Sequence, residues 1–95
     1  MNFEWDECKN ELNRSNHGFD FSDGYRIFDL PIVIEIDDRM DYGEERLIGT
    51  GLLDQRFVVI VYTEPGPEMI RIISLRKALS HERKNYEKYL KNRLG

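Results

Sequence analysis

Cationic side chains gather near the C-terminal end of the sequence. The stretch RIISLRKALSHERKNYE, residues 71–87, begins with an arginine inside an apolar run and continues with two more arginines and two lysines. A guanidinium group presents a planar fork of donors to phosphate oxygens and stays charged at physiological pH. Several such groups in one cleft would stabilise a pentacovalent phosphate transition state. We therefore take Arg71, Arg76 and Lys77 as candidate catalytic residues, and Arg83 as a candidate substrate contact.

Arg71 also has a purely structural interpretation. An arginine in the middle of a strand, flanked by isoleucines and a methionine, must reach solvent, pair with a carboxylate or line a cleft. A salt bridge across the sheet to Glu35 or Glu45 is therefore the alternative to a catalytic role.

Four further residues have side chains suited to the same chemistry. GEER supplies Glu45 as a candidate base and Arg46 as a further phosphate contact, although both are also typical of an ordinary strand edge. His17 is a candidate general acid or base near neutral pH, or else a hydrogen-bonding partner at a helix end. Tyr86 is suited to stacking on a base, or to packing in the core, which is the commoner role.

The standard motifs of metal and nucleotide sites are absent from the sequence. It contains no phosphate-binding glycine loop, no HExxH motif and no nucleophile elbow. The single cysteine, Cys8, excludes an internal disulfide and a cysteine-rich zinc site, and His17 and His81 lie far apart. We expect neither a metal nor a cofactor.

The net charge of −4 conceals two regions of opposite sign. Residues 71–94 contain eight lysines or arginines against two glutamates, whereas residues 1–70 contain six basic and sixteen acidic residues. Such a split favours a basic tail that meets an anion or an acidic partner. A solvated helix face, partly neutralised by the acidic body, has the same composition and is the alternative.

Length and composition indicate one globular domain over residues 1–95. With 40% hydrophobic residues, the 95-residue chain can bury one modest core. The N-terminus MNFEWDE is acidic where a signal peptide would be basic. No apolar run approaches the roughly 20 residues needed to span a bilayer, so we expect a cytoplasmic protein without membrane contact.

Apolar periodicity and capping residues predict three helices. The first covers residues 3–16, with Asp6 as a cap, Trp5, Cys8 and Leu12 on one face, and Gly18 as its end. A second, shorter helix follows a cap at Asp20, has an apolar stripe of Phe21, Tyr25 and Phe28, and ends at Pro31. The last runs from Leu79 or Ser80 to Arg93.

Four β-rich segments between these helices predict an antiparallel meander and an α+β fold. They cover residues 32–36, 45–50, 56–63 and 69–73. Short connections force neighbouring strands to be antiparallel. Pairing of Thr63 with Glu68 would place Val59, Val61, Ile70 and Ile72 on one face, and Ile60, Tyr62, Met69, Arg71 and Ile73 on the other.

Taken in order, these segments resemble the BrnT toxins of bacterial type II toxin–antitoxin modules. FEWDECKNELN is similar to the family's opening FEWDxxKxxxN, and is followed by HG at 17–18 and the short helix at 21–28. GEER, QRFVVIVYTE, RIIS, the RKA of 76–78 and the ER..YE of 82–87 continue in the family's order and spacing. The resemblance covers nearly the whole chain.

The resemblance implies a RelE-like fold and ribosome-independent cleavage of RNA without a metal. In such enzymes a ribose 2′-hydroxyl attacks the adjacent phosphate, while Arg, Lys and Tyr side chains position that phosphate and neutralise its charge. It also implies neutralisation by a BrnA-type antitoxin, with DNA contacted only through that antitoxin. The positions that match the family's pattern are His17, Glu45, Arg46, Arg71, Arg76, Lys77 and Tyr86.

Three positions depart from the family's pattern. Asn16 stands in place of a lysine, Gly24 in place of an alanine, and Leu79 in place of a threonine that would cap the last helix, a role that Ser80 would take one residue later. These departures and the net acidity leave open a catalytically weak or inactive member kept as an antitoxin-binding protein. A stand-alone nucleic-acid-binding protein fits the basic tail but not the sixteen acidic residues of the remainder.

Overall fold

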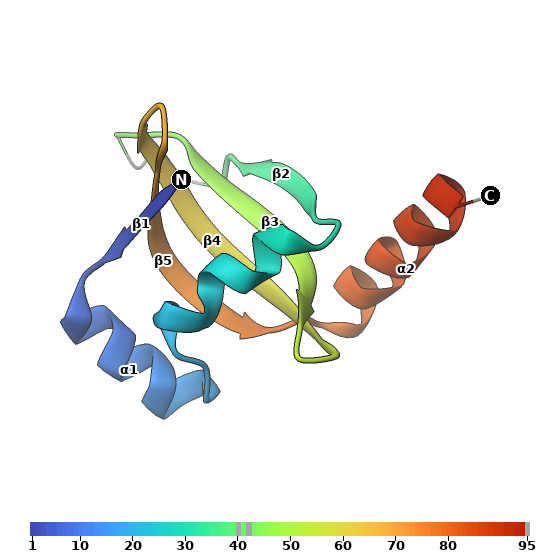
Figure 1. Cartoon of the computed structure of the whole chain (residues 1–95), viewed down its shortest axis with the longest axis horizontal. Coiled ribbons are helices and arrows are strands. Elements are labelled where there is room, and N and C mark those ends of the chain that lie inside the picture. Colours follow the sequence, from blue (N-terminus) through green and yellow to red (C-terminus); the bar gives the residue numbers. More distant parts are fainter. Residues whose placement is uncertain (40, 42, 95) are drawn as a thin grey trace.

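The computed structural model describes residues 1–39, 41 and 43–94, and confirms an α+β fold (Figure 1). In chain order the elements are β1 (Asn2–Trp5), α1 (Glu7–His17), the 3₁₀ helix η1 (Phe21–Asp29), β2 (Val33–Asp37), β3 (Arg46–Leu53), β4 (Arg56–Gly66), β5 (Met69–Lys77) and α2 (Ser80–Leu94). No helix within these ranges combines the length and the apolar character needed to cross a bilayer.

The sheet has five strands and is mixed, in the order β1-β5-β4-β3-β2. Strands β2 to β5 form the predicted antiparallel meander, but β1 adds a parallel strand beside β5, so the four-stranded antiparallel sheet is wrong. The predicted helix over residues 3–16 is wrong in its first turn, because residues up to Trp5 belong to β1 and α1 begins only at Glu7. Phe3 and Trp5 alternate with Glu4, which lets the two aromatic rings pack on the core from a strand.

Helix α1 buries a polar face. Asp6 caps it as predicted, accepting hydrogen bonds from the backbone N–H groups of Cys8 and Lys9. Asn10 and Asn13 are its buried residues, whereas Leu12 keeps 65% of its surface exposed. The predicted apolar stripe is therefore wrong, because α1 is held by side-chain amides rather than by apolar packing.

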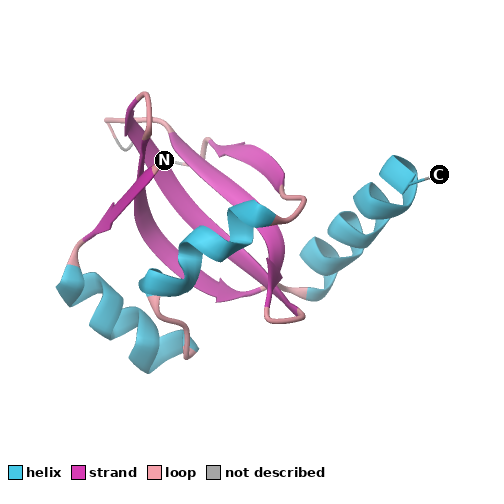
Figure 2. Cartoon of the chain, in the orientation of Figure 1, coloured by secondary structure: helices cyan, strands magenta, loops and turns pink. Residues whose placement is uncertain are grey.

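The second helix is η1, a 3₁₀ helix with the predicted cap at Asp20. Its buried residues, Phe21, Gly24 and Ile27, recur every third position, which is the period of a 3₁₀ helix. The predicted stripe included Tyr25, which is instead half exposed. Figure 2 shows η1 crossing one face of the sheet, with α1 beside the end of β5. The hydrophobic core under this face contains Phe19, Phe21, Ile27, Leu53, Val58, Ile60, Tyr62, Ile70, Ile72 and Leu75.

The register between β4 and β5 differs from the prediction. Two irregularities shift the pairing, so that the opposed residues are Gly66 and Met69, Thr63 and Arg71, and Tyr62 and Ile72. Because each bulge adds an unpaired residue to one strand, residues beyond it change their partners. Ile60 and Tyr62 consequently share the core with Ile70 and Ile72, in place of Val59 and Val61.

Helix α2 projects from the end of the sheet, away from α1 and η1 (Figure 1). It begins at Ser80, so Leu79 stands at the capping position and its N–H donates to Glu82 Oε1 at 2.8 Å. Tyr86 anchors the helix to the body. Its wholly buried ring packs edge-to-face on Phe57, and its hydroxyl donates to the carbonyl of Pro31 at 2.6 Å.

Candidate active site

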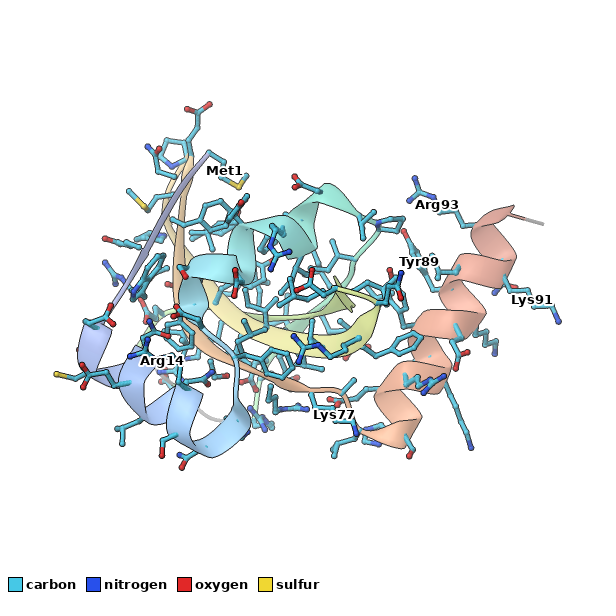
Figure 3. All side chains as sticks on the ribbon, turned by 60° about the horizontal axis from the view of Figure 1, so that its bottom comes forward. Met1, Arg14, Lys77, Tyr89, Lys91 and Arg93 are labelled. Atoms are coloured by element: carbon cyan, nitrogen blue, oxygen red, sulfur yellow. The ribbon has the colours of Figure 1, made fainter. Side chains whose placement is uncertain are left out.

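A cleft of about 450 Å³ opens where β4 begins and β5 ends. Its walls come from the end of α1, the β3–β4 turn, the end of β5 and the first turns of α2. The lining residues are His17, Phe19, Gln55, Arg56, Phe57, Lys77, Ala78 and Arg83. In Figure 3 Lys77 lies between α1 and α2, while Lys91 and Arg93 lie toward the far end of α2. The volume is within the usual range for ligand sites.

A tight turn places Gln55 and Arg56 at the mouth of this cleft. Leu53 pairs with Arg56, and the two connecting residues, Asp54 and Gln55, have left-handed φ angles of 51° and 66°. Such a turn matches the twist of a β-hairpin. Arg26 of η1 holds it, donating to both carboxylate oxygens of Asp54 at 2.6 and 3.1 Å. These bonds lower the pKa of Asp54, and the nearby charge of Arg56 acts in the same direction.

Two arginines in the cleft lie over aromatic rings. The guanidinium carbon of Arg56 is 4.6 Å from the centroid of the Phe19 ring, and that of Arg83 is 4.3 Å from the centroid of the Phe57 ring. Cation–π contact restrains a guanidinium plane and leaves its N–H edge available to an anion. Arg83 also forms an exposed ion pair with Glu87 at 3.5 Å. Among the described residues, no carboxylate forms an ion pair with Arg56 or Lys77, so the cleft is electropositive.

His17 enters the cleft as the last residue of α1. Gly18, with a left-handed φ of 78°, ends the helix as predicted, and its N–H donates to the carbonyl of Arg14 at 2.9 Å. The exposed imidazole therefore faces the same space as Lys77, and a histidine is the side chain best suited to proton transfer near neutral pH.

The structure separates Arg76 from Lys77, which corrects the expectation that they share a pocket. Successive strand residues point to opposite faces of a sheet. Lys77 points into the cleft, while Arg76 binds Glu82 of α2 with two hydrogen bonds of 2.8 and 2.9 Å. These bonds lower the pKa of the Glu82 carboxyl, and that carboxyl also caps α2.

Arg71 lies at the other end of β5 from the cleft. It forms an ion pair of 3.0 Å with Glu4 of β1, the residue opposite it in the parallel pairing. At about 3.3 Å per residue, roughly 20 Å of strand separates it from Lys77. The salt-bridge interpretation of Arg71 is therefore confirmed, but its partner is neither Glu35 nor Glu45.

Three other predicted residues also lie outside the cleft. Glu45 precedes β3 and Arg46 begins it, at the end of that strand remote from the β3–β4 turn, where Arg46 is opposite Asp37. Tyr86 is wholly buried and has no surface with which to stack on a base. Of the eight predicted site residues, the cleft brings together His17, Lys77 and Arg83.

Arg56 is a candidate functional residue that sequence reasoning missed. The sequence does contain a signal for it, because Arg56 precedes Val58, Ile60 and Tyr62 at alternate positions and so ends the apolar face of a strand. Gln55 and the two rings, Phe19 and Phe57, offered no comparable signal. The resulting set of three basic side chains and an imidazole is suited to binding a phosphodiester and stabilising charge on it. Within the described residues, no three His, Cys, Asp or Glu side chains cluster as metal ligands.

Comparison with known proteins adds two findings to this geometry. A family model described as the ribonuclease toxin BrnT of type II toxin–antitoxin systems matches residues 5–82, which include every cleft residue except Arg83. The fold is similar to the 1.1 Å crystal structure of the Brucella abortus ribonuclease toxin BrnT, with a TM-score of 0.65 and 26% identity over 84% of this chain and 99% of that one. No curated protein sequence matches the chain.

Proposed function

The chain belongs to the BrnT family of ribonuclease toxins of type II toxin–antitoxin systems, and we propose that the cleft between α1 and α2 is its endoribonuclease site. One observation carries this proposal. Arg56, Lys77 and Arg83 meet His17 in an open cleft, and the first two have no carboxylate partner among the described residues. Family membership implies an antitoxin partner.

The proposed reaction is attack by a ribose 2′-hydroxyl on the adjacent phosphorus. A bond forms between O2′ and phosphorus, the bond from phosphorus to O5′ breaks, and the products are a cyclic phosphate and a 5′-hydroxyl. His17 accepts the proton from the 2′-hydroxyl. Arg56 and Arg83 bind the non-bridging oxygens, and Lys77 stabilises the leaving oxygen until it takes a proton from water.

Three finer parts of the proposal rest on the cleft and on the family resemblance. The cations supply the charge that a divalent metal supplies in other nucleases, so we propose that cleavage needs no metal. We also propose that the antitoxin is of the BrnA type and that DNA is contacted only through it. A RelE-like relationship stays a prediction.

An assay of RNA cleavage by antitoxin-free protein tests this function. We expect cleavage to continue in excess EDTA and to leave cyclic phosphate termini. Cleavage that stops in EDTA and returns with added magnesium would overturn metal independence. Intact RNA at every protein concentration would overturn the enzymatic assignment.

A second candidate function is antitoxin binding without catalysis. It is supported by the pairing of Arg71 with Glu4 and of Arg76 with Glu82, which neutralises two cations that match the family's pattern. On this alternative the chain binds its antitoxin but neither cleaves RNA nor arrests growth. The cleavage assay separates the two functions, because antitoxin binding is common to both.

A further inference from the structure

An apolar groove of about 400 Å³ lies at the opposite end of the sheet from the cleft. Its apolar walls are formed by Phe28, Ile34, Ile36, Leu47, Tyr62 and Ile70. In Figure 1 the N-terminus and the β4–β5 turn mark this end of the sheet, and the β3–β4 turn marks the other. We call this feature the apolar groove.

The groove leaves large apolar side chains in water. Ile34 and Ile36, which point to the same face of β2, are 48% and 60% exposed. β2 is also an edge strand, because within the described residues it pairs only with β3. Apolar patches and open strand edges on a small protein mark interaction surfaces, since both favour association.

Carboxylates form the rim of the apolar groove. Glu45 and Glu64 line it, and both also line an adjoining hollow of about 150 Å³ that includes Glu44. In the part of the chain that the structure describes, none of these three forms an ion pair. Burial and, after it, the charge of Glu64 raise the pKa of Tyr62 to about 12.

We propose that the apolar groove is the docking surface for the antitoxin, which inserts a segment with an apolar face flanked by lysines or arginines. An apolar floor favours aliphatic or aromatic anchors, and an unpaired acidic rim selects cations beside them. The open edge of β2 offers main-chain hydrogen bonds to the same segment. The inference rests on family membership and on the surface, and does not depend on the chemistry of the cleft.

The test measures binding of the purified antitoxin of the same module to the antitoxin-free chain. We expect the double substitution Ile34→Glu and Ile36→Glu to weaken binding by at least about 30-fold, because it places like charges on the apolar anchor site. Leu12→Glu, at a leucine of α1 that is 65% exposed, is the matched control and should bind normally. A growth readout rests in addition on the proposed function: when antitoxin is co-expressed, the groove variant should still arrest growth, whereas the control should be neutralised.

A second variant separates loss of binding from misfolding of the first variant. Glu45→Lys with Glu64→Lys alters only the rim and should weaken binding about tenfold at low salt, with a smaller salt dependence than the parent chain. Normal affinity in both variants overturns the proposal. So does a dimer of this chain alone that Ile36→Glu dissociates, because the groove would then belong to a second copy. Absence of RNA cleavage would overturn the proposed enzyme but leave this binding test intact.

Discussion

The side chain of Asn13 forms two hydrogen bonds with the backbone of Leu75. The N–H of Leu75 donates to Asn13 Oδ1 at 3.1 Å, and Asn13 Nδ2 donates to the carbonyl of Leu75 at 2.8 Å. The amide thus continues the edge of β5 where the pairing with β1 ends, at Ile72. His17 follows Asn13 by one helical turn and Lys77 follows Leu75 by two residues, so this pair sets the separation of two cleft residues.

Asn13→Ala should lower the free energy of unfolding by about 2–4 kcal/mol, because it leaves buried backbone groups of Leu75 without partners. The lost amide also donates to the carbonyl of Phe19 at 3.1 Å. Chemical denaturation measures the change, and Asn16→Ala, at an exposed position of the same helix, is the control with an effect under about 0.5 kcal/mol. Equal stabilities for the two variants would contradict the bridging role of Asn13.

Arg56→Ala and Lys77→Ala should each lower kcat/KM for RNA cleavage by about 10²–10³-fold, because each removes a cation from the reacting phosphate. Arg71→Ala is the matched control, since it removes an arginine from the far end of β5 and should leave cleavage within about twofold of the parent. Thermal unfolding checks that each variant is folded. Loss of cleavage in the Arg71 variant alone would move the active site to the other end of the sheet.

The meander could be predicted because its signals are local. Runs of β-branched residues, a Pro/Gly turn and short connections identified β2 to β5 within a few residues. β1 could not be predicted in this way, because Asn2–Trp5 is only four residues long and pairs with a strand more than sixty residues away. The bulges between β4 and β5 were missed for a similar reason: alternation of residue types does not reveal an inserted residue.

The candidate site was predicted in part, because residue type is visible in a sequence and pairing is not. His17, Lys77 and Arg83 were found as chemically suitable side chains, and they do share a cleft. Arg71 and Arg76 were equally suitable, but their partners, Glu4 and Glu82, are fixed by the position of β1 and the start of α2. An arginine at the end of the apolar face of a strand, such as Arg56, therefore indicates a residue of the candidate site better than an arginine inside a basic run does.

Arg76 and Glu82 should act on stability rather than on catalysis. Both side chains are mostly buried, and their paired hydrogen bonds join the end of β5 to the first turn of α2. We expect Arg76→Ala to lower the free energy of unfolding by about 1–2 kcal/mol, because Glu82 then loses its charge partner. A double-mutant cycle with Glu82→Ala should give a coupling of about 1 kcal/mol. Loss of cleavage with unchanged stability would instead place Arg76 in the chemistry.

Asp20 should make folding depend on pH at the acid end of the scale. Hydrogen bonds from the backbone of Ser22, the side chain of Asn10 and the hydroxyl of Ser22 lower its pKa from 3.8 to about 2. A carboxyl with a lower pKa in the folded state stabilises the fold above its unfolded pKa, and that contribution is lost as the pH falls. The loss therefore occurs between about pH 4 and pH 2.

The substitution Asp20→Asn tests this dependence, because asparagine still accepts a hydrogen bond from the backbone of Ser22 but carries no charge. The variant should be less stable than the parent at pH 7, and its free energy of unfolding should fall less steeply between pH 4 and pH 2. Denaturant titrations at each pH measure both curves. Asp29→Asn, at the exposed end of η1, controls for the loss of one negative charge. Parallel curves for parent and Asp20→Asn would refute the assignment.

The N-terminus of α2 offers a substitution that should stabilise the protein. Leu79 stands at the capping position, and Glu82 already accepts its N–H, which is one half of a capping box. The leucine side chain is 56% exposed, so replacing it removes little buried apolar surface. Leu79→Thr adds a hydroxyl that accepts the N–H of Glu82, and should raise the free energy of unfolding by about 0.5–1 kcal/mol. Leu79→Val, of similar shape without the hydroxyl, should give no gain, and equal stability of the two variants would show that the cap does not form.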